Sequence, residues 1–265
     1  MSDLPLFYRS IVPLDRERHR ELTLLEPQEF GFARGSHLVP AVVDEFGPAC
    51  RHLPILFLPE SLGPTPVFLT GFRPGASALV DAQGTWTGRY LPAYLRRYPF
   101  ILGEVDGADP LICFDDTSGL LAAPPTEAAA DSGDGWRPLF EAGCGDSPVL
   151  AERIRLVIDY AAAARRTASL GRLLQDLALL RPLTIERRDP ASGESHALHG
   201  VLGIDEAALA ALPEAGFARL REGGWLSAIY AHLVSLQSIR DFTQGFAGPG
   251  SSSSISTPPS DGAAT

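Results

Sequence analysis

The sequence predicts an α+β protein, in which an antiparallel sheet-rich N-terminal half packs with C-terminal helices and a small hairpin as a single unit. Three observations support this prediction. In the first half, short apolar runs alternate with turn residues at the roughly 8–12-residue spacing of an antiparallel sheet. After residue 147, apolar residues recur at helical spacing. Hydrophobic residues make up 45% of the 265 residues, which is enough to build a sizeable core.

Apolar stretches bounded by turn residues define the expected strands of the first half. They are predicted to pair as neighbours: LPILFLP (53–59) with PVFLTGF (66–72), the two halves of SALVDAQGTWTG (77–88), and YPFILGEV (98–105) with LICFDD (111–116). Two short helices are expected to interrupt this sheet, at residues 40–49 and 92–97.

The second half is predicted to be mainly helical. Ser147 followed by Pro148 is typical of an N-cap and the first residue of a helix. The helical pattern runs on to about Leu180, with a break expected around Thr167 and Gly171. The turn DPASGE then predicts a hairpin of LTIERR (183–188) with SHALHGVLGI (195–204). Three further helices are expected, over residues 205–212, 214–222 and 225–242.

One α+β domain over residues 1–246 is expected, because the C-terminal hairpin is too small to bury the apolar stripes of the helices by itself. Residues 122–135 (AAPPTEAAADSGDG) are small, polar and rich in Pro and Gly, and they predict a flexible loop. Residues 247–265 (AGPGSSSSISTPPSDGAAT) predict a disordered tail.

The composition excludes several classes of function. All 22 basic residues are arginine, which excludes a Walker A loop, a lysine Schiff base with pyridoxal phosphate, and kinase-type catalysis with a strand lysine. No bound cofactor is predicted. The net charge of -10 and the absence of an extended basic stripe disfavour binding to nucleic acids or to anionic membranes.

The expected location is cytoplasmic. No apolar run reaches the length of a membrane span, and the N-terminus lacks the pattern of a secretory signal. Three widely spaced cysteines, Cys50, Cys113 and Cys144, form no CxxC pair and are expected to be buried thiols in a reducing compartment.

Four residues within one short window are the catalytic candidates: His37, Glu45, Cys50 and His52. Cys50 and His52 could form a nucleophile pair, although Cys50 also fits a small buried residue at the end of a helix. A non-haem metal site of His37, Glu45 and His52 is the sharpest form of an enzyme hypothesis.

Other polar motifs have simpler explanations. Ser147 in GDSPV fits an N-cap better than a nucleophile. His196 and His199 lie in a predicted strand, where residues three apart point to opposite faces, so joint metal binding is not expected. The acidic residues about the 106–110 turn, with Asp115 and Asp116, are expected to form a solvated turn, and a site for a cation or a cationic ligand is the alternative. No metal site is predicted from these motifs.

The segment YLPAYLRRYPF (90–100) supplies the binding candidates, because aromatic residues and arginine are enriched at the centres of protein interfaces. These candidates are Tyr90, Tyr94, Arg96, Arg97 and Tyr98. On a helix, Tyr94 and Tyr98 would share one face. The alternative is that the aromatic rings belong to the core and the arginines to a solvated edge.

Several stretches together resemble the proteobacterial SapC-like family: HLVPAVVDEFGPACRHLPILF, PVFLTGFRPG, VDAQGTW, YLPAYLRRYPF, LICFDDTSGLL and REGGWLSAIYAHLVSLQSI. The resemblance covers most of residues 5–120 and, more weakly, 149–243. It implies an association with surface-layer (S-layer) protein secretion, and with outer-membrane receptors and tryptophan-halogenase-like flavoproteins as partners. It implies no catalytic residues. A membrane permease with the same short name is a different protein, since no membrane span is predicted here.

Two hypotheses for function follow. The first is a non-catalytic accessory protein of a surface-layer, secretion or uptake system, which binds a peptide, a protein partner or an apolar small molecule. The alternative is an enzyme that tailors a peptide or an aromatic metabolite, with a metal ion in its sharpest form.

Overall fold

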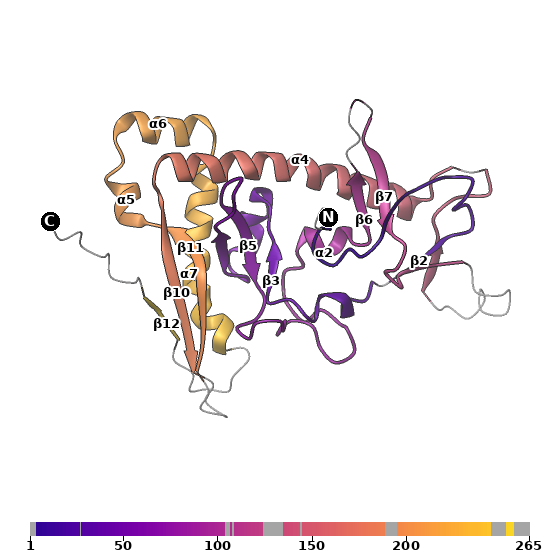
Figure 1. Ribbon diagram of the computed structural model, residues 1–265, viewed down its shortest axis with the longest axis horizontal. Helices are drawn as coiled ribbons and strands as arrows, with labels where there is room; N and C mark the ends of the chain where they lie inside the picture. The colour runs from indigo at the N-terminus through magenta and orange to yellow at the C-terminus, as the bar shows by residue number, and fades with distance from the viewer. Residues whose placement is uncertain are drawn as a thin grey trace. The chain divides into compact units, whose positions relative to one another are not determined.

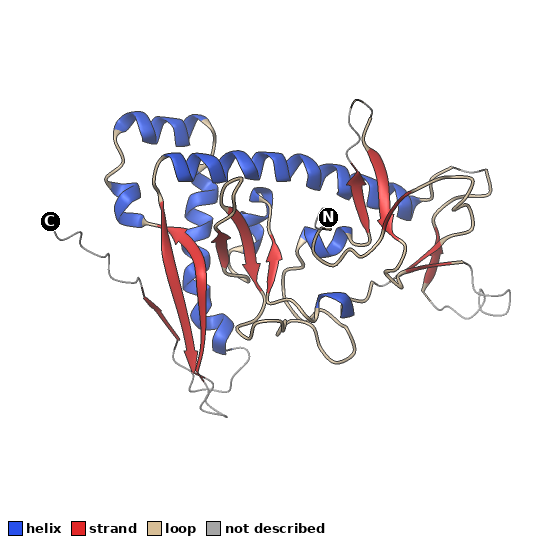
Figure 2. Ribbon diagram, viewed as in Figure 1, coloured by secondary structure: helices blue, strands red, loops and turns tan. Residues whose placement is uncertain are grey.

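The computed structural model describes residues 4–26, 28–103, 107, 109–123, 135–143, 145–188, 195–244 and 253–256. Helices and antiparallel strands make up these parts (Figure 2), so the α+β class is confirmed. The chain divides into two compact units, where the sequence favoured a single one. Unit 1 comprises residues 1–34, 80–87 and 93–162, and unit 2 comprises residues 35–79, 88–92 and 163–265. One domain over residues 1–246 stays a prediction.

Unit 1 contains two small antiparallel sheets. In the first, β7 (Leu111–Asp115) lies between β1 (Ile11–Pro13) and β6 (Phe100–Gly103). In the second, β2 (Thr23–Leu25) lies between β8 (Leu121–Ala122) and β9 (Trp136–Pro138). The predicted hairpin of β6 and β7 is confirmed, whereas the predicted strand pair at 77–88 forms only the single bridge between Val80 and Trp86.

Short helices and an aromatic cluster complete unit 1. The helices are η1 (Gly31–Ala33), α2 (Ala93–Arg97) and the first part of α4 (Pro148–Asp176). The core is rich in aromatic rings, which provide large apolar areas. Its buried members are Tyr8, Leu24, Tyr98, Phe100, Phe114, Leu120, Leu139, Phe140, Leu150 and Val157.

Unit 2 is built on a six-stranded antiparallel sheet of order β12-β10-β11-β4-β5-β3 (Figure 1). Its strands are β3 (Leu38–Pro40), β4 (Ile55–Leu58), β5 (Thr65–Leu69), β10 (Leu180–Arg188), β11 (Ser195–Ile204) and β12 (Ser253–Ser256). Its helices are η2 (Val43–Glu45), α1 (Phe46–Ala49), α5 (Glu206–Ala210), α6 (Glu214–Glu222), α7 (Leu226–Gln244) and the second part of α4. In unit 2, the predicted hairpins of β4 with β5 and of β10 with β11 are confirmed, as are the three predicted C-terminal helices α5, α6 and α7.

The helix α4 is continuous from Pro148 to Asp176, so the break expected around Thr167 and Gly171 is wrong. The Thr167 hydroxyl donates to the carbonyl of Ala163 one turn earlier, so it is satisfied within the helix. The predicted loop 122–135 lies mostly outside the described residues. So does the predicted tail 247–265, of which Ser253–Ser256 pair with β10.

The turn between β4 and β5, residues 59–64, packs closely on α4. A Cβ atom placed on Gly171 would lie 2.3 Å from the carbonyl oxygen of Pro64, which is closer than carbon and oxygen approach one another. Gly63 adopts a φ of +117°, which favours glycine, and its own Cβ position would lie 3.4 Å from the side chain of Arg172. Gly171 is therefore the residue that lets this turn contact the helix.

The helix α7 is joined to the sheet by buried polar side chains. The Nε2 atom of His232 accepts a hydrogen bond from the Ile204 N–H at 3.0 Å, and the Ser235 hydroxyl accepts one from the Ile55 N–H at 2.9 Å. The His232 ring is fully buried against Phe57, and its Nδ1 has no partner among the described residues. Burial lowers the pKa of His232 to about 3, so the ring is neutral at physiological pH.

Acid is expected to destabilise unit 2 through His232. In the unfolded chain this ring takes up a proton below its ordinary pKa of 6.5, whereas in the folded chain it stays neutral until about pH 3. Its contribution to stability is thus complete above pH 6.5 and falls by about 1.4 kcal/mol for each pH unit below it. Urea unfolding of the chain and of His232→Gln between pH 7 and pH 4 measures this slope.

His232→Gln is expected to be less stable than the unchanged chain at pH 7 and to lose less stability on acidification. Replacing the exposed His199 on β11 by Gln is the control, and it should leave the slope unchanged. Equal slopes in the chain and in His232→Gln would contradict the assignment.

The close contact at Gly171 predicts an unusual response to alanine. Gly→Ala inside a helix ordinarily stabilises a protein by up to about 1 kcal/mol. Gly171→Ala is instead expected to destabilise the chain by about 1–3 kcal/mol, because the new methyl group meets the Pro64 carbonyl. Thermal and urea unfolding measure the change. Gly47→Ala in α1 is the matched control, since nothing lies within 4 Å of its Cβ position, and a similar loss there would refute the explanation.

Candidate functional site

The aromatic–arginine segment predicted to bind a partner lies largely in the core. Tyr94, Arg97 and Tyr98 are buried, and Arg96 is half-buried. The Tyr94 hydroxyl donates to the Leu6 carbonyl at 2.9 Å. Burial raises the pKa of Tyr94, and the positive charge of Arg97 offsets part of that effect.

Tyr98 is one of several hydrogen-bond donors that surround the buried carboxylate of Asp115. Asp115 was expected in a solvated turn, but it ends the buried part of β7 and is 0% exposed. It accepts hydrogen bonds from the hydroxyls of Tyr98 and Thr117 and from the N–H groups of Arg9, Ser10 and Thr117. Burial raises the pKa of Asp115, but these hydrogen bonds outweigh it and hold the pKa below its ordinary value. Both residues therefore have a structural role.

Arg97 is surrounded by tyrosine rings. Its guanidinium carbon lies 4.4 Å from the ring centres of Tyr94 and Tyr160 and 5.5 Å from that of Tyr8. These distances are typical of cation–π contacts. We refer to Tyr8, Tyr94, Arg97 and Tyr160 as the Arg97 cage. All four residues belong to unit 1.

Glu45 and Tyr90 contact each other in unit 2. The Tyr90 hydroxyl donates to Oε1 of Glu45 at 2.9 Å, and Oε2 accepts from the Val42 N–H at 3.4 Å. Glu45 is buried at the end of η2, where this second bond caps the helical turn. Glu45 is thus engaged in holding the turn.

The other catalytic candidates make separate local contacts. Nδ1 of His37 accepts from the Gly75 N–H at 3.3 Å, and burial lowers the pKa of His37. The Cys50 thiol is half-buried and donates to the Gly47 carbonyl. His52 is half-buried. Within the described ranges, no three His, Cys, Asp or Glu side chains lie close enough to bind one metal ion, so the set of His37, Glu45 and His52 is not brought together.

The remaining motifs have local structural roles in the described residues. The Ser147 hydroxyl accepts from the Leu150 N–H at 3.3 Å, so its interpretation as an N-cap is confirmed. His196 and His199 lie on the strand β11, as predicted, and His199 is exposed beside Thr184. Cys113 is buried, and burial raises its pKa, whereas Cys144 lies outside the described residues.

A groove that the sequence did not reveal lies beside the β4–β5 turn of unit 2. Its volume is about 760 Å³, and its walls come from the turn, α4 and α6. Leu62 stands at the top of the turn with 88% of its surface exposed. The lining residues, which we call the Leu62 groove, are Ser61, Leu62, Gly63, Ser169, Arg172, Leu173, Gln175, Asp176 and Arg219.

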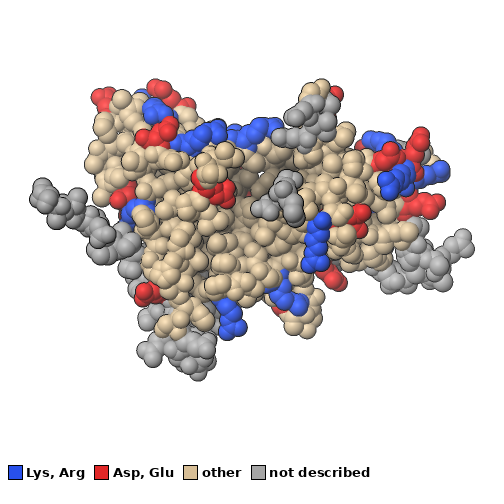
Figure 3. Space-filling model, viewed as in Figure 1, with Lys and Arg blue, Asp and Glu red and all other residues tan. Residues whose placement is uncertain are grey.

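Basic side chains gather along α4 on the face shown in Figure 3, and Arg172 is one of the exposed arginines of this helix. Its Nη2 donates weakly to the Ser169 hydroxyl at 3.4 Å. Arg219 lies 3.6 Å from the carboxylate of Asp176. The Leu62 groove therefore offers one apolar side chain beside exposed charged groups.

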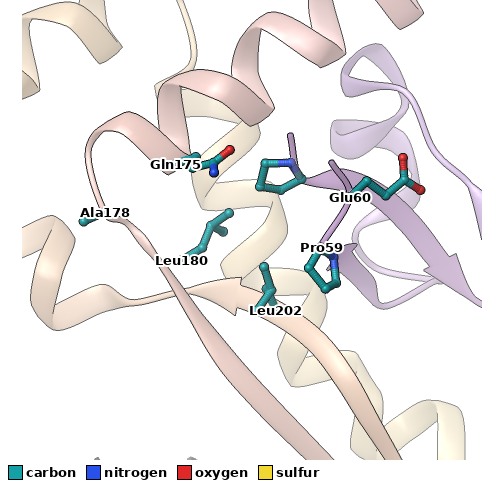
Figure 4. A pocket seen from close by; sticks show the side chains of 7 residues that line it. Pro59, Glu60, Gln175, Ala178, Leu180 and Leu202 are labelled. Atoms are coloured by element: carbon teal, nitrogen blue, oxygen red, sulfur yellow. The ribbon is translucent and has the colours of Figure 1, made fainter. Parts of the chain in front are cut away.

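A second, more apolar cavity of about 220 Å³ is lined in part by residues of the same turn (Figure 4). Leu180 and Leu202 from β10 and β11 line it together with Pro59 and Pro64 of the turn. Gln175 lines both this cavity and the Leu62 groove. Residues of the turn that carries Leu62 line both hollows. The full lining is Pro59, Glu60, Pro64, Gln175, Ala178, Leu180 and Leu202.

A third hollow of about 330 Å³ lies at the start of α7, against η2 and α1. The indole of Trp225 lies over Gly223, where a Cβ atom would be 2.2 Å from its Nε1. An ion pair of Arg166 with Asp44 borders the hollow. The catalytic candidates His37, Glu45, Cys50 and His52 do not line any of these three hollows.

Apolar side chains, arginines and the carboxylates of Glu60, Asp176 and Asp44 line these three hollows. No helix in the described part of the chain is both long enough and apolar enough to cross a membrane. No curated protein and no solved structure matches the chain. The model of one protein family, SapC, matches residues 14–242, which is most of the sequence. The chain therefore belongs to the SapC family.

Proposed function

We propose that this protein is a non-catalytic accessory protein that binds a polypeptide segment of a partner at the Leu62 groove. The observation that carries this proposal is the position of Leu62. A leucine with 88% of its surface in water contributes nothing to its own core, yet it lines a groove of about 760 Å³. Burying such a side chain in an interface gains about 1.5–3 kcal/mol.

The rigidity of the turn supports the same proposal. The Pro64 carbonyl contacts α4 at Gly171, and the Thr65 hydroxyl donates to the carboxylate of Glu60 at 3.0 Å. A turn fixed in this way loses little conformational entropy when a partner binds, so more of the interaction energy contributes to affinity. Leu62 can thus act as a fixed apolar anchor, with Arg172 and Arg219 as polar contacts beside it.

Membership in the SapC family supports a place for this binding activity in a surface-layer, secretion or uptake system. On this proposal the partner is a surface-layer protein, an outer-membrane receptor or a halogenase-like protein. The partner supplies an extended or helical segment with an apolar side chain that covers Leu62.

The role of Leu62 predicts a large effect of one charged substitution. A photo-crosslinking amino acid at position 62 of the full chain, introduced in the native host, is expected to capture the partner for identification by mass spectrometry. Calorimetry with the purified partner then measures its affinity for the chain and for Leu62→Asp. The substitution is expected to weaken binding at least tenfold, because it places a carboxylate where the partner buries an apolar group.

Leu111→Asp is the matched control, since Leu111 is also an exposed leucine, 46% exposed, but lies in β7 of unit 1. This variant should bind the partner as the unchanged chain does. If Leu62→Asp binds the captured partner with unchanged affinity, the Leu62 groove is not the binding site.

A further inference from the structure

Arg97 is a buried cation that forms no ion pair in the described part of the chain. Only 6% of its surface is exposed. Ion pairs in the described part of unit 1 join Arg16 to Asp146, Arg153 to Glu26 and Arg155 to Asp159, and Arg97 takes part in none of them. The nearby carboxylate of Asp115 is occupied by its own donors. Three tyrosine rings are therefore the chief compensation for this charge.

One N–H group of the Arg97 side chain is left without a hydrogen bond. The guanidinium carbon lies over the faces of the tyrosine rings, and the N–H groups lie in the plane of the guanidinium. The Nε atom is buried and has no hydrogen-bond partner. Nε and a neighbouring Nη together form the edge that binds a carboxylate through two parallel hydrogen bonds.

A buried donor without an acceptor is costly, and most native structures avoid it. Methionine or leucine would fill the space among three rings without that cost, and such replacements of buried charges are often stabilising. The presence of arginine at this position is better explained by a group that enters the cage and accepts its hydrogen bonds.

The side chains around the Arg97 cage indicate the chemical nature of the molecule that carries the accepting group. The Leu6 carbonyl accepts a hydrogen bond from the Tyr94 hydroxyl, and the Leu6 side chain is 41% exposed. Phe7 packs against Tyr94 with the ring centres 6.0 Å apart. Tyr160 is the least buried ring of the cage, so a ligand from solvent meets that ring first. The apolar part of a ligand bound at Arg97 would therefore lie next to the apolar side chains of Leu6 and Phe7.

We propose that the Arg97 cage binds a small molecule that carries a carboxylate on an apolar body. The carboxylate takes the Nε edge of Arg97 and the apolar body lies against Leu6 and Phe7. This site is in unit 1 and is independent of the Leu62 groove, which is in unit 2.

The Nε–H signal of Arg97 in a ¹⁵N NMR spectrum of the full chain tests this proposal directly. Sodium octanoate is the probe, with sodium acetate, octanamide and sodium chloride as comparisons. Octanoate is expected to shift the signal saturably and to bind at least tenfold more tightly than acetate. Octanamide has the same apolar chain without the charge, and chloride tests the effect of ionic strength, so neither should reproduce the shift.

Three variants separate a ligand site from a structural arginine. Arg97→Lys keeps the charge but loses the planar edge, so octanoate binding, measured by calorimetry, is expected to weaken at least tenfold. Arg97→Met should abolish binding while the melting temperature stays level or rises. The neighbouring Arg96→Lys is the control and should bind octanoate normally.

An Arg97 signal that octanoate leaves unmoved would overturn the proposal, as would an equal shift with octanamide. If Arg97→Met does not fold, the Arg97→Lys variant and the NMR signal still decide. Leu62→Asp should bind octanoate normally, so the outcome here does not depend on the proposal for the Leu62 groove.

Discussion

The buried carboxylate of Asp115 is the interaction on which unit 1 depends. It binds the N–H groups of Arg9 and Ser10 and so fixes the segment that carries Tyr8. It also accepts a hydrogen bond from the Tyr98 hydroxyl, and this bond holds the chain directly after α2. Because Arg97 is the last residue of α2, the same carboxylate positions two members of the Arg97 cage. An apolar side chain at position 115 would leave these donors unsatisfied in the core.

Unit 2 depends on a different constraint, which is the close approach of the backbone of the β4–β5 turn to the helix α4. Gly171 admits the Pro64 carbonyl to the surface of α4, and this contact fixes the turn between β4 and β5. In the same unit, His232 and Ser235 of α7 accept hydrogen bonds from backbone N–H groups of β11 and β4. Sheet and helices thus hold the turn rigidly, and Leu62 extends from it into solvent.

The sequence predicts the longer elements because their apolar patterns are long enough to be distinctive. The runs of β4–β7 and the hairpin of β10 with β11 were found in this way, as were the three C-terminal helices. Strands of two or three residues, such as β1 and β8, carry no pattern, because they form only where a distant strand supplies their hydrogen bonds.

The errors at the candidate site have the same origin in tertiary contacts. Gly171 suggests a helix break by its intrinsic propensity, but the contact with Pro64 requires glycine at that place in a continuous helix. Arg97 was placed among binding residues from its type alone, and nothing in the local sequence shows that Tyr8 and Tyr160 would enclose it. Leu62 lies in a turn, SLGPT, where a single leucine gives no periodic signal.

Leu62 and Arg97 depart from the ordinary rules of burial in opposite directions. Leu62 is an apolar side chain left in water, and Arg97 is a charge held in the core with an unsatisfied donor. Glu45, Asp115 and Ser147 are also buried polar groups, but hydrogen bonds satisfy each of them, so the fold alone explains their presence. Sequence choices that the fold does not explain are the ones expected to serve function. On the two proposals made above, a second molecule supplies what each side chain lacks: an apolar cover for Leu62 and an anion for Arg97.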